Sequence, residues 1–67
     1  MPVQFKVYLH LNNISVMELY EAMYLRGHDV TYNELARYGR CYGRDVKPRW
    51  KQIETCLKEN FGIEMPW

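Results

Sequence analysis

The sequence predicts a mainly α fold with a small β component, built as one domain over residues 1–67. Capping residues mark two helix starts, at Ser15 and Thr31, and an apolar stripe over 46–61 indicates a third helix. Apolar and polar residues alternate over 3–11, which is typical of a strand with one buried face. Because 48% of the residues are hydrophobic, we expect the chain to fold rather than to be disordered.

The N-terminal strand is expected to need a pairing partner, because a lone strand leaves its backbone N–H and C=O groups unsatisfied. The short segment IEMPW, at 63–67, is the other candidate strand. The first strand therefore pairs either with this segment or with a second copy of the chain, and a homodimer through the N-terminal strand is the expected assembly. Its apolar face comprises Val3, Phe5, Val7, Leu9 and Leu11.

The first helix is predicted over 16–26. Ser15 and Glu18 have the spacing of a capping box, in which each side chain binds the other residue's free backbone N–H. Gly27 suits the left-handed position that commonly follows a helix end. The expected apolar stripe consists of Val16, Leu19, Tyr20, Met23 and Tyr24.

The second helix is predicted over 32–38 by the same pattern, with Thr31 as the cap and Glu34 as its reciprocal partner. Gly39 is expected to end the helix. Tyr38, one residue earlier, is expected to pack in the core.

The third helix is predicted over 46–60, with Pro48 in its first turn, where a missing backbone N–H is tolerated. The preceding stretch RYGRCYGRD, at 37–45, carries Tyr-Gly-Arg twice. We interpret it as a hinge whose arginines point away from the core. The apolar face of the third helix is expected to hold Val46, Trp50, Ile53, Leu57 and Phe61.

Positive charge is concentrated between residues 37 and 51. This segment holds six basic residues and one acid, a net charge of +5, while the remaining three basic and seven acidic residues give −4. One pole of positive potential is therefore expected, although the formal net charge of the whole chain is only +1.

The stretch LYEAMYLRGHDVTYNELARYG, at 19–39, resembles the first two helices of winged helix-turn-helix DNA-binding domains. The long break before the third helix resembles the effector domains of two-component response regulators. The resemblance implies a three-helix helix-turn-helix core whose third helix reads DNA. No wing hairpin is expected within residues 63–67, because five residues leave room for one strand. The matching positions are Gly27, Val30, Thr31, Glu34 and Leu35.

The favoured function is that of a small DNA-binding protein that regulates transcription or excision, in the cytoplasm with the nucleoid. Helix 46–60 is expected to read duplex DNA through Lys51, Gln52 and Thr55, whose side chains match base edges in the major groove. Tyr42 is expected to donate a hydrogen bond to a phosphate. The remaining phosphate contacts are expected from Arg37, Arg40, Arg44, Lys47 and Arg49.

Protein binding is the alternative function. A small, aromatic-rich chain is typical of phage- or plasmid-type inhibitors and adaptors, and the Arg/Tyr loop offers anchors for docking on a host protein. A third interpretation of Gln52 and Thr55 is that they simply cover the solvent side of a helix. Trp67 is expected either to fold back over the core or to enter a partner's pocket.

Enzymatic chemistry is not expected, because the sequence pairs no nucleophile with a base and has no glycine-rich phosphate loop. We expect no cofactor and no metal, since His10 and His28 do not stand at ligand spacing from a cysteine. Cys41 and Cys56 are expected to be free thiols. No apolar run approaches the ~20 residues of a membrane span.

Overall fold

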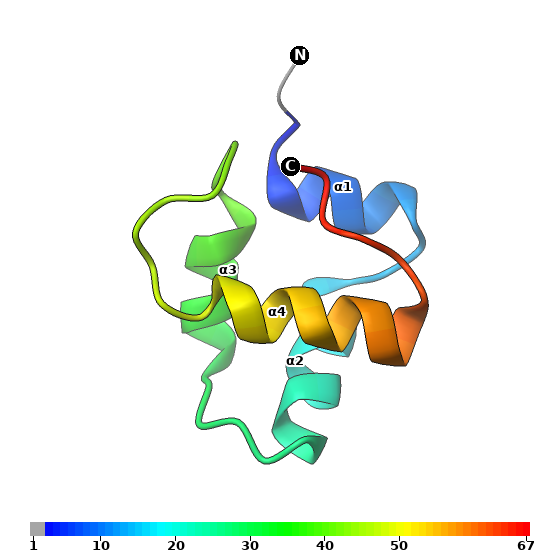
Figure 1. Ribbon diagram of the computed structural model, residues 1–67, viewed down its shortest axis with the longest axis vertical. Coiled ribbons are helices and arrows are strands. Elements are labelled where there is room, and N and C mark those ends of the chain that lie inside the picture. Colours follow the sequence, from blue (N-terminus) through cyan, green and yellow to red (C-terminus); the bar gives the residue numbers. More distant parts are fainter. Residues whose placement is uncertain (1–2) are drawn as a thin grey trace.

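The computed structural model describes residues 3–67, and these residues form helices joined by loops (Figure 1). In this view α4 crosses the middle of the molecule, with α1 on one side of it and α2 on the other, while α3 lies near its N-terminal end. The tail after residue 61 runs back towards α1. The elements are α1 (Phe5–Leu11), α2 (Val16–Leu25), α3 (Tyr32–Gly39), α4 (Trp50–Cys56) and the π-helical turn η1 (Leu57–Phe61) that continues α4.

The predicted N-terminal strand is wrong, because its residues form helix α1. Phe5 and Leu9, four residues apart, share one face of this helix and are each only 1% exposed. Val7 and Leu11 point to the other side and are 40% and 70% exposed. A helix satisfies its backbone hydrogen bonds internally, so α1 needs no strand partner. The predicted dimer through this strand therefore loses its basis.

The predicted C-terminal strand is wrong as well, and residues 3–67 contain no strand at all. Residues 63–67 form an irregular tail that packs on the helices. The Tyr8 hydroxyl donates a hydrogen bond to the Glu64 backbone oxygen, which joins the tail to α1. Side chains of Ile63, Met65 and Trp67 pack against the core.

Helix α2 begins and ends close to the predicted positions. The Glu18 backbone N–H donates to Ser15 Oγ at 3.0 Å, and the Ser15 N–H donates to Glu18 Oε1 at 3.1 Å, so the predicted capping box is confirmed. The helix ends at Leu25, one residue before the predicted end. Gly27 follows with a φ of +86°, in the left-handed region that favours glycine.

Helix α3 has half of its predicted capping box. Thr31 Oγ1 accepts from the Glu34 backbone N–H at 3.1 Å, as expected for the cap. The Glu34 carboxylate instead accepts from Arg49 Nε at 2.8 Å. The helix includes Gly39, where a Cβ atom would lie 3.2 Å from the Lys6 Cβ atom. Gly39 therefore allows α1 and α3 to approach each other closely.

Helix α4 begins at Trp50, later than the predicted start, and Val46 is fully exposed instead of buried. The loop before α4 is held by the Asp45 carboxylate, which accepts from the Lys47 backbone N–H at 3.0 Å and from Trp50 Nε1 at 2.8 Å. These bonds fix a turn, and Pro48 disfavours the helical conformation at Lys47, the residue before it. The helix therefore does not extend back to Val46, and it begins at Trp50.

Trp50 lies among three aromatic rings in the core. Its ring centroid is 5.3 Å from that of Phe5, 4.8 Å from that of Tyr38 and 5.4 Å from that of Trp67, each in an edge-to-face arrangement. Tyr38 is 2% exposed, which confirms its predicted core position. Of the two alternatives for Trp67, the structure shows the one in which it folds back over the core.

Candidate nucleic-acid interface

The three predicted base-reading residues lie together on the N-terminal half of the continuous α4–η1 helix. Lys51, Gln52 and Thr55 line an open hollow of about 340 Å³. Two residues from the end of α2, Arg26 and His28, line the same hollow. Sequence reasoning did not find these two, because nothing in the local pattern indicates that the end of α2 packs beside α4. The hollow thus combines three cationic or titratable side chains with an amide and a hydroxyl.

Arg26 is held in place by the far end of the α4–η1 helix. Its Nη2 atom lies 2.7 Å from Glu59 Oε1, and its Nη1 atom donates to Asn60 Oδ1 at 2.8 Å. The arginine side chain is 30% exposed, so one side of the guanidinium still meets solvent. Arg26 therefore joins α2 to η1 and also contributes positive charge to the hollow.

Arg49, predicted to contact a phosphate, is used within the molecule. Its Nε atom donates to Glu34 Oε2 at 2.8 Å, Nη1 to Gln52 Oε1 at 2.8 Å and Nη2 to the Asp29 backbone oxygen at 2.5 Å. Its side chain is only 17% exposed. Arg49 therefore connects the start of α4 with α3 and with the loop after α2.

Arg44 and Lys47 each have a carboxylate partner. Arg44 Nη2 lies 2.8 Å from Glu54 Oε2, and Lys47 Nζ contacts the Asp45 carboxylate. The hydrogen bonds from Lys47 and Trp50 hold the pKa of Asp45 well below its usual range. The bond to Asp45 raises the pKa of Lys47 in turn. Both ion pairs are more than a third exposed, and such pairs are readily exchanged for other partners.

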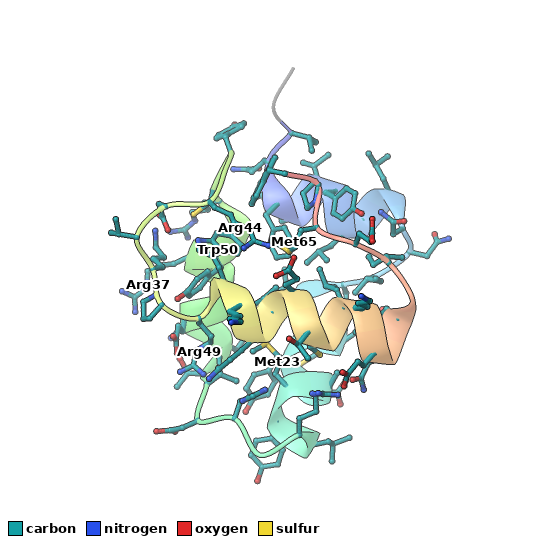
Figure 2. All side chains as sticks on the ribbon, viewed as in Figure 1. Met23, Arg37, Arg44, Arg49, Trp50 and Met65 are labelled. Carbon is teal, nitrogen blue, oxygen red and sulfur yellow. The ribbon has the colours of Figure 1, made fainter. Side chains whose placement is uncertain are left out.

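Three predicted contact residues, Arg37, Arg40 and Lys51, form no ion pair within residues 3–67. All three are exposed. Arg37 lies on the outer side of α3, and Figure 2 shows it extending away from α4. Arg40 caps the end of the same helix. Among the predicted contact residues, these three cations are the most available to an external anion.

The arginines of the loop do not all lie on one side of α4. In Figure 2, Arg44 and Arg49 lie on opposite sides of this helix. Arg37 and Lys47 line a second hollow of about 340 Å³, together with Glu34. Tyr42 is 60% exposed and lies in the loop between α3 and α4. The predicted cluster therefore surrounds the start of α4 rather than forming one flat patch.

The other side of the α4–η1 helix, which faces the C-terminal tail, has the opposite character. A larger open hollow of about 660 Å³ lies between it and the tail. Three carboxylates, from Glu54, Glu59 and Glu64, line this hollow, with Lys58 as the cation among them. An anionic ligand would be attracted to the hollow lined by Lys51 and Arg26 and repelled by the hollow beside the tail.

The cysteines do not form a reactive site in the described structure. Cys41 Sγ lies 3.6 Å from Lys47 Nζ and 3.7 Å from Asp45 Oδ2. Burial and the Asp45 charge raise the pKa of Cys41, and burial raises the pKa of Cys56. Both thiols are free and are protonated near neutral pH.

Residues 3–67 hold no group of three or more His, Cys, Asp or Glu side chains placed to bind a metal ion. The same residues include no helix with the length and apolar character needed to cross a bilayer. No family model, curated protein or solved structure matches the chain.

Proposed function

We propose that the protein binds duplex DNA through the N-terminal half of the α4–η1 helix, as a small helix-turn-helix-like regulator of transcription or excision. The observation that carries the proposal is the shared hollow of Lys51, Gln52 and Thr55 with Arg26 and His28. These side chains come from separate elements and include hydrogen-bonding groups suited to base edges.

The basic residues divide into two groups by availability. Arg37 and Arg40 lack a carboxylate partner within the described residues and are the first candidates for phosphate contacts. Arg44 and Lys47 can exchange their exposed partners for phosphates at small energetic cost. Arg49 supports the site indirectly, because its bond to Glu34 holds the start of α4 against α3. Phosphate contacts position a protein on DNA, and base contacts provide specificity.

The dimensions of the molecule suit a short duplex. Its longest extent is 33 Å, close to one helical turn of B-DNA, which is about 34 Å. The N-terminal half of a recognition helix usually makes the base contacts, and the hollow lies along that half of the α4–η1 helix. A duplex of about two turns therefore contains the whole binding site and suffices for a test.

The test measures affinity for such a duplex by fluorescence anisotropy over a series of salt concentrations. We expect micromolar or tighter binding at low salt. The double variant R37A/R40A should bind all sequences more weakly, and the slope of log affinity against log salt should decrease by about 2, one for each lost phosphate contact.

Lys58→Ala is the matched control for the single variant Arg37→Ala, because Lys58 lies among carboxylates at the other end of the α4–η1 helix. It removes one positive charge but should leave the salt slope unchanged. The absence of binding at low salt and tens of micromolar protein would disprove the proposal. A control variant as weak as Arg37→Ala would show that net charge alone drives binding.

Docking on a host protein is the second candidate function, and the loop 40–49 favours it. Tyr42 is 60% exposed and Val46 is 100% exposed, beside arginines that suit interface anchors. The protein would then act as an inhibitor or adaptor. Val46→Ser separates the two functions: it should sharply reduce the yield of a cross-linked host complex identified by mass spectrometry, while affinity for DNA stays within about twofold because the substitution changes no charge.

A further inference from the structure

The hydrogen-bonding capacity of Gln52 is limited by Arg49. Arg49 Nη1 lies 2.8 Å from Gln52 Oε1. A guanidinium has only donors, so the amide must present its oxygen to Arg49 and its NH₂ group outwards. The same guanidinium also donates to Glu34 Oε2 at 2.8 Å and to the Asp29 backbone oxygen at 2.5 Å, and these bonds fix its position. Gln52 is exposed and therefore offers solvent mainly two N–H donors.

The two neighbouring side chains on α4, Lys51 and Thr55, also have a limited hydrogen-bonding capacity. Lys51 carries an ammonium group, which only donates hydrogen bonds. Thr55 Oγ1 donates to the Lys51 backbone oxygen at 3.1 Å, so its hydroxyl proton is already used and its oxygen is left to accept. Two adjacent donor groups, at Lys51 and Gln52, thus face the ligand side at the start of α4.

We propose that α4 selects duplexes that present guanine to Lys51 and Gln52. In the major groove guanine shows two acceptors, N7 and O6, whereas adenine shows one acceptor and one donor and cytosine shows a donor. Glutamine reads adenine by using both its amide oxygen and its NH₂ group. Arg49 occupies the oxygen here, so this bidentate pairing with adenine is disfavoured. The inference rests on the proposed DNA-binding function and adds its sequence preference.

The first experiment selects binding sequences from duplexes with a randomised centre. Guanine should be enriched at one or two adjacent positions. The second compares three otherwise identical duplexes that carry guanine, 7-deazaguanine or adenine at the enriched position. 7-Deazaguanine keeps base pairing and phosphate charge but lacks the N7 acceptor. We expect at least about fivefold tighter binding of the guanine duplex, the lower range of a bidentate side-chain contact.

Substitutions on α4 assign the preference to its residues. Gln52→Ala and Lys51→Ala should each reduce the discrimination between guanine and 7-deazaguanine. Both side chains are exposed, so the variants should fold like the parent chain. Gln52→Glu replaces the donors by acceptors and should shift the selected base from guanine towards cytosine.

The outcomes separate this inference from the proposed function. Salt-dependent binding without guanine enrichment, or equal affinity for adenine and guanine, would overturn the inference and leave DNA binding intact. Binding to no duplex would overturn both. Guanine enrichment that survives unchanged in both Gln52→Ala and Lys51→Ala would also overturn it, because another surface would then read the base.

Discussion

At the scale of single residues, Arg49 differs from the other arginines of the basic segment by its partners. Its guanidinium forms hydrogen bonds to α3, to α4 and to the loop after α2, while Arg44 makes one exposed pair with Glu54. Sequence reasoning gave both residues the same role, because charge and spacing do not reveal that Glu34 lies opposite Arg49. Glu34 and Arg49 are brought together by the fold, which places the start of α4 beside α3.

This difference predicts unequal effects on stability. Arg49→Ala should lower the free energy of unfolding by about 2–3 kcal/mol, because it leaves the partly buried Glu34 and the Asp29 carbonyl without their charged donor. Arg44→Ala should lower it by less than about 1 kcal/mol, as expected for an exposed pair. Urea denaturation followed by circular dichroism measures both. Equal losses would show that the Arg49 network does not hold the helices together.

Asp45 makes the stability depend on acid pH. Its folded pKa lies below the unfolded value of about 3.9, so its contribution is fully present above about pH 4 and is lost progressively as the pH falls further. Asp45→Asn should therefore show a shallower decline of the unfolding free energy between about pH 4 and pH 2 than the parent chain. Urea denaturation at a series of pH values tests this, and parallel curves would contradict it.

At the scale of elements, the sequence predicted helices with capping signals and failed where two periodicities overlap. The capping residues at Ser15 and Thr31 predicted α2 and α3 to within one residue at each end. In the segment 3–11, Phe5 and Leu9 fit both a period of two and a helical spacing of four. In the helical form, Phe5 packs against Trp50 in the core. No local sequence pattern reveals this contact.

The helical form of α1 predicts which of its apolar residues matter. Leu9→Ala should lower the unfolding free energy by about 2–5 kcal/mol, because Leu9 is buried in the core. Val7→Asp should lower it by less than about 1 kcal/mol, since Val7 lies on the exposed side. Denaturation curves of the two variants check this contrast. A strand with Val7 and Leu9 on one buried face would instead make both substitutions severe.

At the scale of the whole molecule, the residues of the candidate site could be predicted but their surroundings could not. Lys51, Gln52 and Thr55 share a helix, so their position beside one hollow follows from helical spacing. Arg26 and His28 line the same hollow only because α2 packs beside α4, and the sequence does not indicate this packing. The predicted charge of the basic segment is reduced by carboxylates at Asp45, Glu34 and Glu54. Such long-range pairing depends on the fold and has no local signal.

The packing of the tail on the core gives the protein an optical reporter. The indole rings of Trp50 and Trp67 lie with centroids 5.4 Å apart, close enough for their electronic transitions to couple. This coupling depends on the tail being docked and hardly at all on the helical content. Near-ultraviolet circular dichroism and tryptophan fluorescence can therefore follow the release of residues 63–67 separately from the melting of the helices.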